Sequence, residues 1–183
     1  MLDKDTFKQR EFWLEEKYFH ARDQELLEKI RRRQELKEAV GQANDEIIIH
    51  LEEMGWTRES VRDLLPLTPL VQVAWAEGYV SEKERKAILS LAEERGITEG
   101  KPSYAQLLAW LEERPSEEFF IQTLKIIGAL LHLLPEKDRQ VSRQDILKYC
   151  RRIAEASGDI LGLWHHTTRR EKETLGKIAT ALE

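Results

Sequence analysis

The sequence contains few of the residues and patterns that mark an enzyme or a disulfide-rich protein. Among its 183 residues there is one cysteine, Cys150, so the chain cannot form an internal disulfide or a cysteine-based zinc site. Cys150 shares an apolar helical stripe with Ile146, Ile153 and Ala154, and we expect it to pack as a small hydrophobic side chain. The phosphate-binding, dinucleotide-binding, zinc-protease and nucleophile-elbow motifs are also missing. The sequence therefore gives no support to a catalytic function.

No stretch of the chain predicts a signal peptide or a membrane span. Residues 1–5 are polar and are not followed by the apolar segment of a signal peptide. The longest apolar stretch, Phe119 to Leu134, contains Gln122, Lys125 and His132 and falls short of the roughly 20 apolar residues that span a bilayer. We therefore expect no membrane insertion and a cytoplasmic location.

The charge balance gives no general attraction to nucleic acids or anionic membranes. The formal net charge is -5, from 29 Lys and Arg and 34 Asp and Glu. The one basic cluster, residues 31–33, lies between Glu28 and Glu35, which is typical of a solvated helix face rather than of a phosphate site. We expect no nucleic-acid partner.

Strand signals are nearly absent, whereas helix starts and stops occur along the whole chain. The only run of β-branched residues, Ile47 to Ile49, continues into Leu51 and Met54 with helical spacing. Capping boxes, in which Ser or Thr and an acid or amide three residues later bond each other's backbone N–H, are predicted at Ser81–Glu84, Ser103–Gln106 and Thr168–Glu171, with a variant at Ser142–Asp145 and a simple cap at Ser116. The predicted helices cover residues 4–40, 45–54, 58–65, 69–77, 82–95, 104–113, 117–134, 143–157 and 169–182. The expected fold class is all-α.

The first helix differs in composition from the others. Residues 1–40 hold ten basic and ten acidic residues, and Phe12, Phe19 and Leu26 follow one another at a spacing of seven. The apolar stripe has two interpretations. Either this long amphipathic helix packs back onto the following domain, or it mediates self-association or partner binding.

A short pattern occurs twice in the chain. Val73 to Val80 corresponds to Ile153 to Ile160 at a constant offset, with alanines, a glycine and a β-branched residue in matching places. The helices that follow also correspond, with Glu84 matching Glu171. Glycine permits the positive φ that turns the chain off a helix end. The pattern predicts two related helical hairpins, turning at Gly78 and at Gly158, that pack on each other and on the helix at 117–134.

The first of these hairpins carries a resemblance to a known family. The segment Ala76 to Arg85 resembles the A-x-D-G-x-[IV]-x-x-x-E signature of TerB-like domains, which include the TerB tellurite-resistance proteins and the N-terminal module of the DjlA co-chaperones. The resemblance extends over residues 57–183. It implies a compact all-α domain, a role in a bacterial stress or tellurite response, and acidic residues that bind a divalent metal ion. On this sequence those acidic positions are Glu77, which replaces the aspartate, and Glu84, which also has a structural interpretation as a capping residue.

The sequence therefore predicts a long amphipathic helix at residues 1–40 and a TerB-like all-helical domain at residues 41–183. The expected function is that of a non-enzymatic binding or scaffold module of a stress response, with a protein partner or self-association and a divalent cation at Glu77 and Glu84. The alternative is a structural interaction protein that oligomerises or docks through its N-terminal helix and has no metal site. A transition-metal site at His165 and His166 is a weaker hypothesis, because adjacent histidines in an exposed loop are usually not ligands. A helical hydrolase with a carboxylate-bound metal is also weaker, because the chain contains no Glu-x-x-His.

Overall fold

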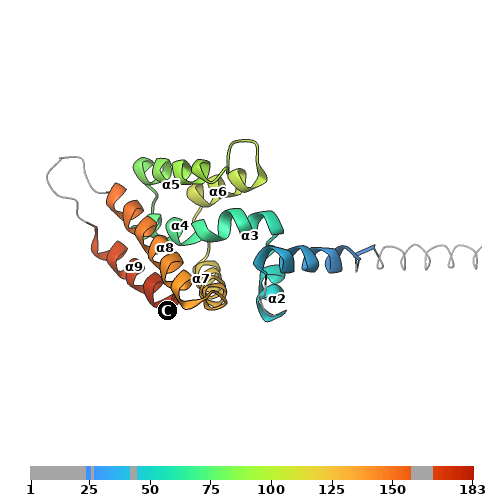
Figure 1. The fold of residues 1–183 in the computed structure, drawn as a ribbon. Coiled ribbons are helices and arrows are strands. Elements are labelled where there is room, and N and C mark those ends of the chain that lie inside the picture. The colour runs from blue at the N-terminus through green and yellow to red at the C-terminus, as the bar shows by residue number, and fades with distance from the viewer. Residues whose placement is uncertain (1–23, 26, 42–44, 158–166) are drawn as a thin grey trace, which may run out of the picture.

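The computed structural model describes residues 24, 25, 27–41, 45–157 and 167–183. These residues form helices joined by turns and contain no strand, so the all-α prediction is confirmed for them (Figure 1). Residues 27–40 form the first described helix. The elements that follow are α2 (Asp45–Glu53), α3 (Arg58–Leu64), the 3-10 turn η1 (Leu65–Leu67), α4 (Thr68–Ala74), α5 (Glu82–Glu94), α6 (Pro102–Glu112), α7 (Glu117–His132), α8 (Glu136–Ser157) and α9 (Arg169–Ala181).

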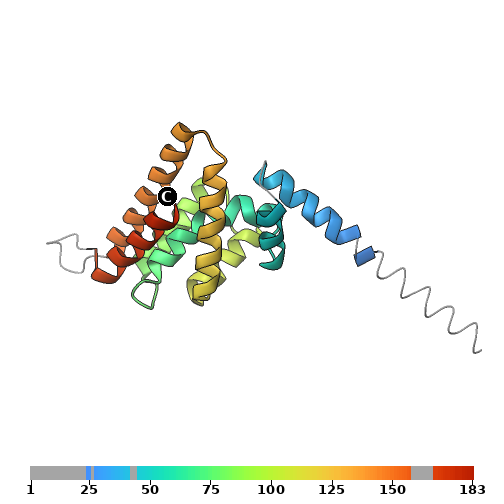
Figure 2. The same cartoon turned by 90° about the horizontal axis from the view of Figure 1, so that it is seen from below.

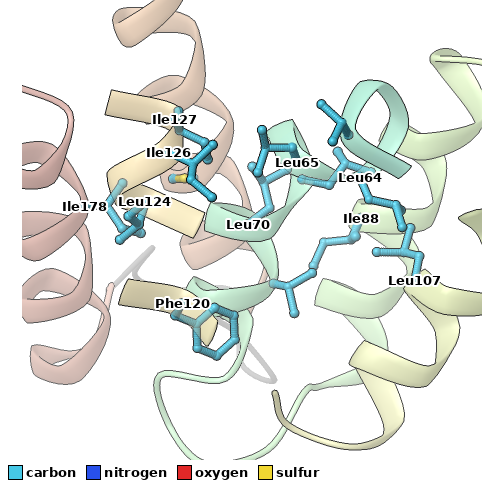
Figure 3. Close-up of a cluster of buried hydrophobic side chains, with 14 of the residues drawn as sticks. Leu64, Leu65, Leu70, Ile88, Leu107, Phe120, Leu124, Ile126, Ile127 and Ile178 are labelled. Atoms are coloured by element: carbon cyan, nitrogen blue, oxygen red, sulfur yellow. The ribbon is translucent and has the colours of Figure 1, made fainter. Parts of the chain in front are cut away.

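The short helix α4 lies at the centre of the domain. All seven of its residues are buried, and it contacts α5, α7, α8 and α9. Figure 3 shows Leu70 of α4, Phe120 of α7 and Ile88 of α5 in the same cluster of buried side chains. A helix that is buried on every side must be surrounded by other elements, so α4 fixes the positions of the helices packed around it.

The helices that carry the sequence duplication share this core. Besides packing on α4, α8 contacts α5 and α9, and α7 contacts α8 and α9 (Figures 1 and 2). Gly78, at the turn after α4, has φ of 92°, a conformation that side chains with a Cβ rarely adopt. Gly158 lies outside the described residues. The contacts agree with one shared core, while the relationship between the two hairpins stays a prediction.

Two of the predicted capping boxes are confirmed, and one box was missed. Both reciprocal hydrogen bonds are present at the starts of α5 and α9, where Ser81 and Thr168 are the N-caps. Ser116 caps α7 as predicted, through its Oγ, which accepts from the N–H of Phe119 at 3.1 Å. Thr57 opens α3 with a box completed by a serine hydroxyl instead of a carboxylate or amide.

The predictions for Ser103 and Ser142 are wrong. Helix α6 begins at Pro102, where a proline loses no hydrogen bond, so Ser103 lies inside the first turn. Its hydroxyl donates instead to Oδ2 of the buried Asp63 at 3.0 Å. Helix α8 begins at Glu136, well before the predicted residue 143, so Ser142 lies in the helix interior.

The early start of α8 follows from the residues after Pro135. Glu136 and Asp138 lie in the first turn, where the positive end of the helix dipole favours carboxylates. Glu136 also accepts a hydrogen bond from Gln140 and forms an ion pair with Arg139. These side chains stabilise the first turn without a Ser or Thr cap.

Only one half of the helix at residues 27–40 is attached to the domain. Leu36 is fully buried, and Arg33 reaches Glu52 of α2 with its Nε 3.2 Å from the carboxylate. Residues 27–32 are all exposed, and Figure 2 shows this part of the helix running away from the body. Among the described residues, this helix therefore combines a buried anchor at Leu36 with an exposed arm, residues 27–32. The predicted helix before residue 24 lies outside the described residues.

The structure also describes the β-branched run, the cysteine and two of the helix ends. Ile47 to Ile49 are helical, and Cys150 is fully buried. Gly55 and Gly96 end their helices with positive φ. Within the ranges that the structure describes, no helix has the length and apolarity needed to cross a bilayer.

Candidate carboxylate site

The structure places both predicted metal-binding residues around the turn between α4 and α5. Glu77 is half-buried in the turn itself, next to Gly78. Glu84 lies in the first turn of α5 and is only 3% exposed. Its Oε2 accepts hydrogen bonds from the backbone N–H of Ser81 at 2.8 Å and from the Ser81 hydroxyl at 2.6 Å. Glu84 therefore performs the capping function and is at the same time a buried carboxylate.

A third glutamate occupies the corresponding place in the second pair of helices. Glu171 of α9 is fully buried, and its Oε2 accepts from the backbone N–H of Thr168 at 2.6 Å. A buried carboxylate needs hydrogen-bond donors or a counter-charge to offset the loss of hydration. Each glutamate obtains donors from its own helix start.

Burial and two neighbouring carboxylates act on the pKa of Glu84. Burial raises the pKa of Glu84 above its ordinary value, against the two hydrogen bonds from Ser81, which favour the ionised form. The negative charges of Glu171 and Glu77 raise the pKa of Glu84 further. The charges of two other carboxylates thus disfavour the ionised form of the buried Glu84. Protonation of Glu84 or a cation bound beside it would offset this unfavourable interaction.

The described residues do not complete a metal centre by themselves. They contain no group of three or more His, Cys, Asp or Glu side chains arranged to hold a metal ion. Magnesium is commonly held by one or two carboxylates together with water, whereas calcium takes six to eight oxygen ligands. A cation at Glu84 would therefore need water and backbone carbonyls as ligands in addition to carboxylates.

Comparison of the chain with protein-family models, with curated proteins and with solved structures found no match. The TerB-like resemblance therefore depends on the sequence pattern around Gly78 and its repeat around Gly158.

The remaining histidines of the domain and the cysteine have structural roles or lie outside the described residues. His50 and His132 each use Nδ1 in a 2.9 Å hydrogen bond to the carbonyl oxygen four residues earlier on their own helices. Burial raises the pKa of the Cys150 thiol to about 12, so this thiol is protonated and unreactive at neutral pH. His165 and His166 lie outside the described residues.

Three aromatic rings form one wall of a pocket between α3 and α6. The ring centroids of Trp56, Trp110 and Phe119 are 5.1–6.1 Å apart, and the pocket beside them has a volume of about 320 Å³. At these distances the rings pack against one another and leave no space between them for a ligand.

The sequence named Glu84 as a site residue but not its partner Glu171. The duplication contained the signal, because Glu171 corresponds to Glu84. Correspondence in sequence cannot show that the charge at one position affects the pKa at the other. That step required the packing of α5 and α9 around the central helices.

Proposed function

We propose that this chain is a non-enzymatic, TerB-like helical module of a bacterial stress or tellurite response, and that it binds a divalent cation at the turn between α4 and α5. Two related hairpins would share one core, and Glu77 and Glu84 would supply carboxylate oxygens from the first hairpin. The observation that carries the proposal is the burial of Glu84 close enough to Glu171 and Glu77 for their charges to raise its pKa. A cation would offset this cost, since nearby positive charge favours ionised carboxylates.

The cation proposal is tested by thermal and urea unfolding of the full chain with Ca²⁺, Mg²⁺, Mn²⁺ or Zn²⁺. A ligand that binds only the folded chain adds about 2.7 kcal/mol to the free energy of unfolding at 100 times its dissociation constant. Glu84→Gln and Glu77→Gln should reduce this gain. The matched control is Glu82→Gln, which changes an exposed glutamate in the same first turn of α5.

Glutamine at position 84 separates metal binding from helix capping. Glutamine serves as the third residue of a capping box as glutamate does, so Glu84→Gln keeps the start of α5 and removes one anionic ligand. Absence of stabilisation by all four ions would eliminate the cation site. An equal gain in the wild type and in Glu84→Gln would place the ion elsewhere.

A second candidate function has its own observation. Leu27 and Ile30 are 65% and 54% exposed on the arm, and residues 27–32 are all exposed. An isolated helix of this length is marginal in water, so a partner helix or a second copy of the chain would stabilise it. This supports an interaction protein that docks through its N-terminal helix.

Light scattering of the full chain tests this second function. The arm hypothesis predicts a mass above that of one chain, returning to one chain in the variant with Leu27→Gln and Ile30→Gln. Both side chains are exposed, so the domain should keep its stability within about 0.5 kcal/mol. A single-chain mass for the wild type would contradict self-association through the arm.

A further inference from the structure

A long apolar groove lies where the end of the helix at residues 27–40 meets α3, η1, α7 and α8. Its volume is about 650 Å³, within the range of small-molecule sites. Val61, Leu65 and Leu131 form its buried floor, and Leu133 and Leu134 stand at its rim, 47% and 39% exposed. The groove shares no residue with the carboxylate site, so ligand binding in the groove does not depend on the proposed function.

The charged groups along the groove provide more hydrogen-bond donors than acceptors. Arg95 has its guanidinium carbon 5.8 Å from the centre of the Tyr149 ring and has no ion pair within the described residues. Arg62 uses Nε for the buried Asp63 at 3.0 Å, while its side chain remains 72% exposed. Asp145 of α8 is the opposing charge. The groove therefore has two guanidiniums with free N–H groups and one carboxylate, and this balance favours a ligand with an anionic head group.

We propose that this groove binds a fatty carboxylate, with the alkyl chain along the apolar floor and the carboxylate on Arg95. Stacking on Tyr149 holds the guanidinium in place, which lowers the cost of ordering it when the ligand binds. Arg62 supplies further donors to the same head group. Asp145 repels the carboxylate and limits the affinity.

The test is calorimetric titration of the full chain with three probes that share one alkyl chain and differ in the head group. The probes are decanoate, decanol and decyltrimethylammonium, each below its micelle-forming concentration. The proposal predicts saturable binding of decanoate, weaker binding of decanol and the weakest binding of the cation. Methyl NMR should show decanoate-induced shifts concentrated at Ile127, Leu131 and Ile146.

Variants separate the head-group contact from binding to apolar surface in general. Arg95→Gln should weaken decanoate binding by about tenfold, the factor expected for losing a charge-assisted hydrogen bond. Asp145→Asn should strengthen it, and both variants should bind decanol as the wild type does. The control is Arg152→Gln, which changes an exposed arginine of α8 outside the groove.

The results of these titrations can either support or overturn the proposed fatty-carboxylate site. Decanoate preference that depends on Arg95 and shifts confined to the groove would support the site. Equal binding of the three probes, preference for the cation, insensitivity to Arg95→Gln, or no saturable binding would each overturn it.

Discussion

The buried glutamate at position 84 has two roles that oppose each other energetically. Its carboxylate satisfies the N–H and hydroxyl of Ser81, which stabilises the start of α5. Burial and the neighbouring charges of Glu171 and Glu77 disfavour the same ionised form. Glutamine, which carries no charge, could serve equally well in a capping box. A negative charge at position 84 is therefore needed for cation binding but not for capping.

The metal-free stability of the chain should therefore depend on pH through Glu84. Because the folded state raises its pKa above the ordinary 4.5, the folded chain binds this proton more tightly than the unfolded chain. The stabilisation from the protonated form is complete below pH 4.5 and is lost as the pH rises through the raised pKa. Urea unfolding should show the wild type losing stability relative to Glu84→Gln as the pH increases. A constant difference, or one that grows in favour of the wild type, would contradict this explanation.

Gly128 is a residue whose small size is required by a close helix contact. A Cβ built at Gly128 of α7 would lie 2.7 Å from the carbonyl oxygen of Ala181, at the end of α9. Gly128→Ala should lower the free energy of unfolding by about 1–3 kcal/mol through overpacking, although alanine favours helices. Gly176→Ala in α9 is the control, because no atom lies within 4 Å of its built Cβ. Equal stabilisation by both substitutions would show that α7 and α9 are not this close.

At the scale of single elements, two serines that the sequence predicted as helix caps can be compared directly. Ser116 caps α7, whereas Ser142 lies within α8. Ser116→Ala should cost about 1 kcal/mol of stability. Ser142→Ala should change it by less than about 0.5 kcal/mol. Chemical denaturation of the two variants measures the difference, and a larger cost at position 142 would restore the later helix start.

The helix at residues 27–40 should respond to substitution only in its anchored half. Leu36 is fully buried against the domain, so Leu36→Ala should cost about 2–5 kcal/mol. Leu27→Ala, at a side chain that is 65% exposed, should be neutral within about 0.5 kcal/mol in the single chain. Thermal unfolding at low protein concentration checks both values. Equal effects would mean that the arm packs along its whole length.

For the whole molecule, sequence patterns located most elements but not the contacts between them. Capping residues marked the starts of α5, α7 and α9, because a capping hydrogen bond acts within one turn of its own helix. Pro102 and Glu136 showed the limit, since proline and acidic first turns begin helices without the serine that the prediction required. The burial of Glu84 and the effect of Glu171 on its pKa depend on tertiary packing, which no local pattern specifies.

The negative charge of Glu171, at the start of α9, raises the pKa of Glu84, at the start of α5, and the proposed site depends on the closeness that this effect implies. A double-mutant cycle with Glu84→Gln and Glu171→Gln, measured by urea unfolding at neutral pH without metal, tests it most directly. Each single substitution relieves the same repulsion, so the gain in the double variant should be smaller than the sum of the two single gains. Strict additivity within about 0.5 kcal/mol, as distant sites show, would contradict the proximity of the two carboxylates.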